Sequence, residues 1–361
     1  MNANTKKLHD AGQSIWLDNI TRDLLDKGTL ARYIDELSVT GLTSNPTIYE
    51  QAIGAGTAYD DSIRELAVRG LAGEDLFFEL ALQDLRRAAD LFRPVFDATQ
   101  GVDGWVSLEV SPLLANDTAA TVKVAADLHK RAARPNLFIK IPGTEAGIAA
   151  IEESIFAGVP VNVTLLFSRD QYLAAAHAYM RGIQRRLDAG LDLKVESVAS
   201  LFVSRWDVSV AKDTPAALHN RLGVAVAMRT YNAYRELLLS ESWRKLEAAG
   251  AHPQRLLWAS TGVKDPDARD TLYIEALVAP NTVNTMPEKT LLAFADHGKI
   301  GESLAFSGGT SEDVIEEFRH ASVDDTALAA RLQREGGESF NKSWRALIAS
   351  LEEKTAQKKA Q

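Results

Sequence analysis

The chain contains no cysteine, which excludes disulfide bonds, thiolate nucleophiles and cysteine-based metal sites. Its seven histidines never form an H-x-x-x-H pair, a spacing typical of zinc sites on helices. Carboxylates at the predicted strand ends are too few to converge on Mg²⁺. We therefore expect no metal ion and no cofactor.

Long apolar runs and an excess of basic residues are absent as well. The first residues, MNANTKKLHDAGQS, lack the apolar core of a signal peptide, and no run reaches the roughly 20 residues of a membrane span. The 361 residues include 40 Lys and Arg against 49 Asp and Glu, a net charge of −9 that is unlike a nucleic-acid-binding surface. The sequence predicts a cytoplasmic protein that binds neither membranes nor nucleic acid.

Short apolar segments that alternate with helical patterns run along the whole chain. Several are rich in Val, Leu and Ile on both faces, as in strands covered by helices. This alternation favours an α/β fold, a single (β/α)8 TIM-type barrel over residues 1–361, with an open doubly wound sheet as the alternative. The predicted strands are residues 14–18, 37–46, 104–112, 136–143, 160–168, 195–205, 255–262 and 275–284.

Two further helical regions are predicted outside the repeating strand–helix pattern. One covers about 50–95, where a run over 73–92 should end before Pro94 because proline disrupts a helix interior. The other is a C-terminal extension at about 287–357. The sequence does not distinguish a monomer from a homodimer.

Polar residues recur where the predicted strands end. In a barrel of this type these ends meet at the mouth, where active sites lie. Strand alternation puts Glu109 on the same face as Ser107, and Asn162 on the same face as Thr164, so both pairs can point inward beside Lys140. The full set is Asp18, Thr43, Ser44, Asn45, Glu109, Lys140, Asn162, Thr164, Ser200, Arg205 and Ser260.

A buried lysine among such groups has a definite chemistry. Burial disfavours the cation and lowers the pKa of the amine from about 10.4, and the neutral amine forms a Schiff base with a ketone. The protonated imine withdraws electrons, so a nearby carbon–carbon bond can break to leave an enamine. Two carboxylates, such as Glu109 and Asp18, could move the protons that these steps require.

Six motifs in order, GLTSNPTIYE, SLEVSP, FIKIPGT, NVTLLFS, LFVSRWD and APNTVNTMP, resemble the transaldolase family in its longer bacterial form. The resemblance covers roughly residues 14–345. It implies a class I Schiff-base enzyme of the non-oxidative pentose phosphate pathway, built on a (β/α)8 barrel. Its substrates would be sugar phosphates: a dihydroxyacetone unit passes from sedoheptulose 7-phosphate to glyceraldehyde 3-phosphate, giving erythrose 4-phosphate and fructose 6-phosphate.

The resemblance also implies a role for each site residue. Lys140 matches the Schiff-base lysine, and Glu109 matches an acid/base that acts through a water also held by Thr164. Asp18 matches the carboxylate that deprotonates the C4 hydroxyl. The implied substrate-binding residues are Asn45, Asn162 and Ser200 for the dihydroxyacetone part, Arg205 for the phosphate, and Ser260 and Lys264 beside it.

Two positions depart from the family pattern. Many members carry an arginine two residues after Ser260 as a second phosphate ligand, but this chain has Gly262 there. Backbone amides of Thr261 and Gly262, or Lys264 reaching back, could substitute for it. The first strand reads LDNI instead of a glycine-containing version, which keeps Asp18 and leaves its neighbours unassigned.

Each candidate residue also has a simpler structural interpretation. Lys140 could extend its amine to solvent, Glu109 could only neutralise Lys140, Asp18 could cap a helix near Thr21, Asn45 could form a turn before Pro46, and Arg205 could pair with Asp207.

Two other functions stay open on the sequence alone. A fructose 6-phosphate aldolase would release dihydroxyacetone to water, although that group is typically shorter and tends to carry glutamine at the place of Glu109. A sugar-phosphate-binding barrel without catalysis is the second alternative. It is disfavoured because the lysine and both carboxylates are present.

Overall fold

The computed structural model describes residues 1–54 and 56–359; residues 55 and 360–361, which the predicted 1–361 domain includes, lie outside the described residues. In the described part, eight parallel strands form a closed barrel in the order β1 to β8. Because β1 pairs with β8, the predicted (β/α)8 barrel is confirmed and the open sheet is excluded. The strands are β1 Gln13–Asp18, β2 Val39–Thr43, β3 Trp105–Glu109, β4 Leu137–Pro142, β5 Val161–Leu166, β6 Ser197–Phe202, β7 Arg255–Ala259 and β8 Thr282–Met286.

The predicted eighth strand, 275–284, is wrong over most of its length. Leu272–Ala276 forms helix α13, and β8 begins only at Thr282. Pro280 has no backbone N–H to give to a sheet, and Asn281 has a left-handed φ of 59°. The apolar residues before Pro280 are therefore buried in a connection that precedes the strand.

Aromatic side chains fill the barrel beneath its polar mouth. Strand alternation puts Trp16 and Phe138 on the same interior face as Asp18 and Lys140, which follow them by two positions. Trp105 stacks on Phe138 with ring centroids 4.0 Å apart, and Trp16 lies 6.1 Å from Phe138. These rings give the polar side chains of the mouth an apolar floor.

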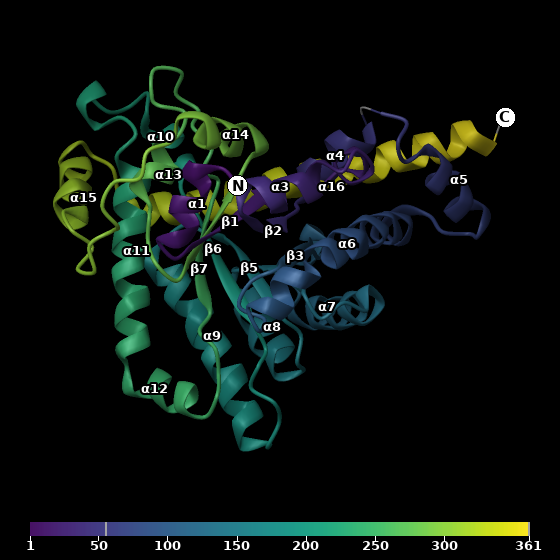
Figure 1. Cartoon of the computed structure of the whole chain (residues 1–361), viewed down its shortest axis with the longest axis horizontal. Coiled ribbons are helices and arrows are strands. Elements are labelled where there is room, and N and C mark those ends of the chain that lie inside the picture. Colours follow the sequence, from purple (N-terminus) through teal and green to yellow (C-terminus); the bar gives the residue numbers. More distant parts are fainter. Residues whose placement is uncertain (55, 360–361) are drawn as a thin grey trace.

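Helices surround the barrel and connect its strands (Figure 1). Their apolar faces pack against the outward-facing strand residues such as Ile139 and Ile141, both fully buried. They are α1 Ala3–Asp10, α2 Arg22–Asp26, α3 Thr29–Leu37, α7 Thr118–Ala132, α8 Glu145–Phe156, α9 Arg169–Asp188, α10 Ser204–Val210, α11 Leu222–Leu239, α12 Glu241–Ala248, α13 and α14 Glu288–His297.

Additional helices lie between β2 and β3: α4 Pro46–Gly54, α5 Asp60–Val68 and α6 Gly73–Ala98. The predicted stop before Pro94 is wrong, because α6 continues through this proline. Pro94 is exposed near the end of the helix, and the following turn is held by tertiary packing. Phe96 packs edge-on against Trp105 with ring centroids 5.2 Å apart.

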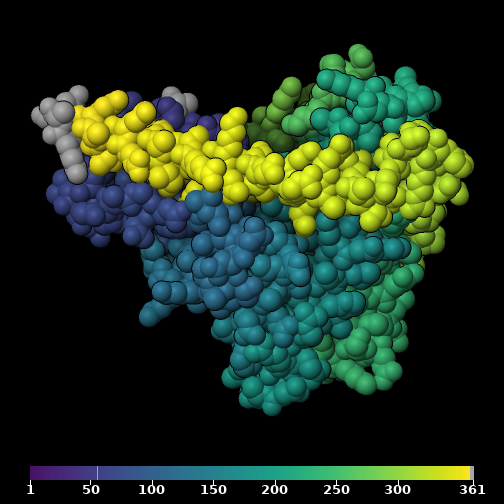
Figure 2. Space-filling model, turned by 180° about the vertical axis from the view of Figure 1, so that it is seen from behind, coloured from purple at the N-terminus to yellow at the C-terminus, as the bar shows by residue number. Residues whose placement is uncertain are grey.

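The C-terminal extension is not continuous over 287–357 as predicted. A non-helical segment with Gly308 and Gly309 at positive φ separates α14 from α15, Ser311–His320. Helix α16, Asp325–Lys359, then crosses one face of the molecule as a single rod of 35 residues (Figure 2). It packs against α4, α5 and α6. Within residues 1–54 and 56–359, no helix has the length and apolar character of a membrane span.

Candidate active site

The registers of β3, β4 and β5 bring the central side chains of the mouth together. Glu109 is paired with Lys140, and Lys140 with Asn162, so the three side chains point to the same side of the sheet. Lys140 is only 4% exposed. Its Nζ lies 3.0 Å from Glu109 Oε2 and donates a 3.1 Å hydrogen bond to the carbonyl of Ser44. The amine is therefore held inside the barrel and does not extend to solvent.

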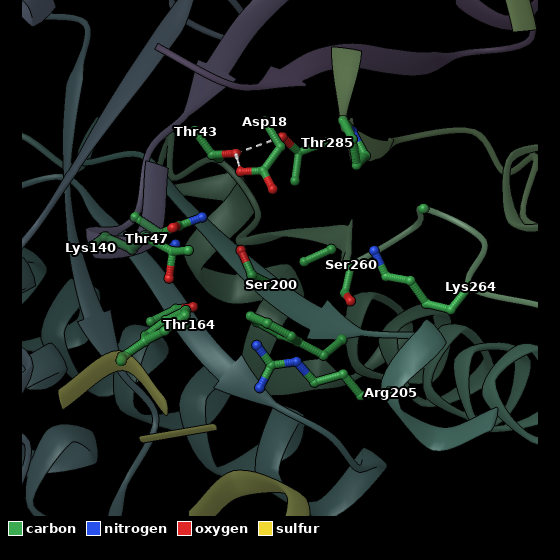
Figure 3. Close-up of a pocket in the computed structure, with 16 residues that line it drawn as sticks. Asp18, Thr43, Thr47, Lys140, Thr164, Ser200, Arg205, Ser260, Lys264 and Thr285 are labelled. Atoms are coloured by element: carbon green, nitrogen blue, oxygen red, sulfur yellow. Dashed lines mark hydrogen bonds between the residues drawn. The ribbon is translucent and has the colours of Figure 1, made fainter. Parts of the chain in front are cut away.

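Asp18 lies across the mouth from this pair, at the end of β1. Its Oδ1 accepts a 2.8 Å hydrogen bond from Thr43 Oγ1, which also lies 2.6 Å from Thr285 Oγ1 (Figure 3). Helix α2 is capped by Thr21, whose hydroxyl accepts from the Leu24 amide at 3.1 Å. The interpretation of Asp18 as a helix cap is thus wrong, and its carboxylate is directed at the mouth.

Burial raises the pKa of both carboxyl groups, Asp18 and Glu109. The positive charge of Lys140 acts in the opposite direction at each, as does the Thr43 hydrogen bond at Asp18. The negative charge of Asp18 adds to the rise in the pKa of Glu109. Both carboxyls therefore hold a proton more strongly than exposed carboxyls do, which suits groups that accept and return protons.

The end of β5 is irregular beside Thr164. The β5–β6 register shifts between Val163 and Leu166, and Leu165 has a left-handed φ of 59°. Such bulges redirect side chains next to active sites. Thr164 lines the cavity, and its buried hydroxyl has no hydrogen-bond partner within the described chain. The hydroxyl is thus available to a substrate or a water.

Asn162 is level with Lys140 in the strand register but does not reach the cavity wall. It is fully buried, does not line the cavity, donates to Ser107 Oγ at 3.1 Å and accepts from Ser200 Oγ at 2.7 Å. Ser200 does line the cavity, so this chain of bonds fixes the position of its hydroxyl.

Asn45 combines a structural contact with a place in the cavity wall. Its Oδ1 accepts a 3.1 Å hydrogen bond from the Ile48 amide in the first turn of α4, so Asn45 caps this helix instead of forming a separate turn. Asn45 also lines the cavity. Among the described residues its amide nitrogen has no protein hydrogen bond, which leaves a donor for a ligand.

Arg205 lies on the opposite side of the cavity from Lys140 (Figure 3). Its guanidinium lies 5.2 Å from the ring centroid of Phe202, and no carboxylate of residues 1–54 and 56–359 pairs with it. Asp207 accepts from the Leu222 amide at 2.9 Å and from Tyr273 Oη at 2.8 Å. The proposed Arg205–Asp207 pair is therefore absent from the described structure.

Lys264 supplies a second cation at this end, and its amine points into the cavity near Ser260 (Figure 3). Within the described chain it has no carboxylate partner. Its Nζ is 3.8 Å from the position that a Cβ on Gly262 would occupy, so it reaches back over the glycine. Ser260 has a left-handed φ of 55°, and its hydroxyl lies 2.9 Å from that of Ser204.

The chain matches known proteins over nearly its full length. The family model described as Transaldolase/Fructose-6-phosphate aldolase matches residues 15–351. The transaldolase of Saccharopolyspora erythraea is 45% identical over 99% of both chains. That of Mycolicibacterium smegmatis is 45% identical over 96% of both, and that of Thermobifida fusca 44% over 99% of both. The chain belongs to the transaldolase family.

As a transaldolase the chain is an enzyme, and the alternative of a barrel without catalysis is not supported. Curated relatives at this level of identity carry the name of the transfer enzyme and not of the aldolase that shares the family model. The cavity at the barrel mouth is therefore the place to look for transaldolase chemistry.

Most of the predicted transaldolase site lines this single cavity, formed by Asp18, Asn45, Lys140, Thr164, Ser200, Arg205, Ser260 and Lys264 together with residues that sequence reasoning missed. Glu109 does not line the cavity, but its carboxylate contacts the Lys140 amine. Thr43, a predicted strand-end residue, and Gly262, a predicted backbone contact, also line the cavity. The missed lining residues are Thr47, Phe202, Ala259, Thr285, Pro287 and Phe340. Phe202 and Thr285 stand within the recognised motifs and could have been found by strand alternation. Phe340 comes from α16, and no local pattern connects it to the mouth.

The LDNI departure also has a structural explanation. Asn19 donates a 3.3 Å hydrogen bond to Glu288 Oε2, and Tyr33 donates to Glu288 Oε1 at 2.7 Å. Asn19 thus joins the end of β1 to the start of α14. The departure from the family pattern therefore affects how the end of β1 is held against α14, and it leaves the position of Asp18 unchanged.

Proposed function

We propose that Lys140 is the Schiff-base lysine of this transaldolase, which moves dihydroxyacetone from sedoheptulose 7-phosphate to glyceraldehyde 3-phosphate. The products are erythrose 4-phosphate and fructose 6-phosphate, in the non-oxidative pentose phosphate pathway. The observation that carries the proposal is the burial of Lys140, 3.0 Å from Glu109, in a cavity whose far side holds Arg205 and Lys264.

Glu109 serves the formation of the imine. A proton that moves from Lys140 to Glu109 across the 3.0 Å contact leaves a neutral amine, which attacks the C2 carbonyl of the ketose. Glu109 then returns the proton to the departing hydroxyl, through a water that Thr164 also holds. Since burial raises the pKa of Glu109, the carboxyl accepts and returns this proton readily.

Asp18 serves the cleavage of the carbon–carbon bond. Its carboxylate takes the proton of the C4 hydroxyl, the C4 oxygen forms the aldehyde, and the C3–C4 electron pair moves into the iminium to give an enamine. The aldose leaves, a second aldose enters, and the same steps run in reverse. Thr43 holds Asp18 in place at 2.8 Å.

The remaining residues bind and orient the substrate. Asn45 and Ser200 face the hydroxyls of the dihydroxyacetone part, with Asn162 supporting Ser200 from below. The phosphate is bound at the other end by the residues Arg205, Lys264 and Ser260. Two cations without carboxylate partners in the described chain match the double charge of a phosphate, and the Lys264 amine replaces the arginine missing at Gly262.

Replacing Arg205 with alanine should raise the KM for fructose 6-phosphate by about 10- to 100-fold, because a charged hydrogen bond contributes roughly 1.5–3 kcal/mol. Unphosphorylated dihydroxyacetone as donor should be nearly unaffected. Steady-state kinetics with both donors measure the difference. Arg221→Ala removes an exposed arginine paired with Glu317 and is the matched control. Equal loss on both donors would contradict the phosphate assignment.

Trapping the intermediate tests the proposal as a whole. Borohydride added to the enzyme with fructose 6-phosphate should reduce the imine and fix a three-carbon adduct on Lys140. Peptide mapping by mass spectrometry locates the modified residue. An adduct on another lysine, or none while transfer proceeds, would overturn the assignment of Lys140.

We further propose that residues 1–361 act as one domain, as a monomer or a homodimer in the cytoplasm. In support, residues from one chain line the whole described cavity, including its cover by α16. Light scattering coupled to size-exclusion chromatography gives the assembly state directly.

A further inference from the structure

Helix α16 passes directly over the mouth of the barrel. Gln333 Nε2 donates hydrogen bonds to the carbonyl of Gly143 at 2.9 Å, directly after β4, and to that of Leu165 at 3.0 Å, near the end of β5. A Cβ on Gly336 would lie 3.0 Å from a Leu165 methyl and 3.2 Å from Arg205 Nη1. This part of α16 therefore lies as close to the mouth as a helix backbone can.

Phe340, one turn beyond Gly336, closes the cavity from above. Its side chain is 4% exposed and lines the cavity. The ring centroid lies 5.8 Å from Lys140 Nζ and 5.9 Å from Arg205 Cζ. The Phe340 ring is thus close to both groups that the proposed function assigns to the two ends of the bound ketose phosphate.

We propose that Phe340 is a specificity-determining residue, which packs on the carbon chain of the bound sugar and keeps bulk water from C3 of the three-carbon enamine on Lys140. The proposal rests on the Schiff-base function assigned to Lys140. Its consequence is that the dihydroxyacetone unit stays on the enzyme until an aldose accepts it.

Transfer and release compete for one enamine. In transfer, C3 of the enamine bonds to the aldehyde carbon, whose oxygen takes up a proton, and hydrolysis of the new imine then frees the product ketose. In release, C3 takes a proton instead, water adds to C2 of the resulting imine, and the carbinolamine collapses to free dihydroxyacetone and the amine of Lys140. The outcome depends on whether water reaches the three-carbon enamine on Lys140. An apolar ring over the site excludes this water and therefore favours transfer.

The position of Phe340 is fixed by contacts outside the cavity. Trp344, one turn further along α16, donates a 2.7 Å hydrogen bond from Nε1 to Glu74, and its ring centroid lies 4.9 Å from that of Phe77. Thr47 donates to Ser343 Oγ at 2.9 Å. The helix is therefore a fixed cover rather than a mobile lid.

The test compares release with transfer in the full-length enzyme. Free dihydroxyacetone formed from fructose 6-phosphate without acceptor measures release, and sedoheptulose 7-phosphate formed with erythrose 4-phosphate measures transfer. In Phe340→Ala we expect the release-to-transfer ratio to rise by about tenfold, at the lower end of what one apolar contact gives to discrimination. Phe340→Val should raise the ratio in the same direction, and Phe340→Leu, which keeps most of the apolar cover, should raise it least.

Trp344→Phe is the matched control, because it removes only the hydrogen bond to Glu74 and keeps an aromatic ring against Phe77, so α16 and Phe340 stay in place and the cavity is unchanged. It should leave the ratio at the wild-type value. An unchanged ratio in both Phe340→Ala and Phe340→Val, or an equal rise in Trp344→Phe, would overturn the role of the ring. If the ratio contradicts the role of the ring while borohydride still traps dihydroxyacetone on Lys140 in these variants, only this inference is refuted. If borohydride traps no dihydroxyacetone on Lys140 in the wild-type enzyme, the proposed function itself is refuted.

Discussion

Replacing Lys140 with methionine abolishes transfer of the dihydroxyacetone unit, with an expected loss in kcat/KM on the order of 10⁴-fold or more. Methionine keeps the length and apolar character of the lysine stem but has no amine, so no imine can form at this position. Electron withdrawal by the iminium is the driving element of the proposed cleavage, and the other amine of the cavity, Lys264, is assigned to the phosphate. A coupled assay of transfer and the borohydride adduct, measured together, give the result.

Lys264→Met is the control for this experiment, because it removes the other lysine of the same cavity. It should weaken binding of phosphorylated donors while adduct formation at Lys140 continues. Removing the Lys140 cation also leaves Glu109 buried without its partner, so thermal melting of Lys140→Met is needed to show that the fold survives. Undiminished transfer in a folded Lys140→Met enzyme would show that the chemistry lies elsewhere.

The barrel and the centre of its site could be predicted from the sequence because their determinants are local. Each strand is a short apolar run, and a polar residue such as Asp18 or Lys140 after an apolar partner two positions earlier already marks an interior face at the mouth. The two carboxylates and the lysine lie on strand ends that the fold brings together. Knowledge of the barrel topology therefore suffices to place them around one cavity.

The features that sequence reasoning missed depend on contacts between distant segments. Phe340 reaches the cavity only because α16 is anchored by Trp344 on α6, which no periodicity in either segment indicates. Likewise α6 continues past Pro94 because Phe96 packs on Trp105, against the local preference of proline. Asn162 was placed on the correct face, but its exclusion from the cavity wall follows from its bonds to neighbouring strands.

The hydrogen bonds that orient Asp18 also come from segments that are distant in the sequence. Thr43 and Thr285 come from β2 and β8, the two strands that flank β1, and their hydroxyls lie 2.6 Å apart. Closure of the barrel is what makes this contact. The carboxylate is thus oriented by the fold and by a hydrogen bond that favours its charged form.

Changing Asp18 to asparagine should separate the two halves of the proposed mechanism. The amide cannot take the C4 proton, so transfer should fall by about 10²- to 10⁴-fold, the contribution typical of a positioned base. Imine formation needs Lys140 and Glu109 but not this base, so it should persist. Borohydride should then trap the intact six-carbon ketose on Lys140, where the wild-type enzyme gives the three-carbon adduct. Mass spectrometry distinguishes the two adducts, and a three-carbon adduct formed at the wild-type rate would contradict the role of Asp18.

The pH dependence supplies an independent check on the same residue. Asp18 acts as a base only when ionised, and burial raises its pKa, so kcat/KM should rise with pH as this group loses its proton. Thr43→Val removes the hydrogen bond that favours the ionised form, which should move this rise to higher pH. In Asp18→Asn the residual activity should lose the part of the rise that belongs to Asp18, and a rise that remains is that of Glu109. A profile that is the same in all three enzymes would mean that another group titrates on the acid side, since only Asp18 accepts the hydrogen bond that Thr43→Val removes.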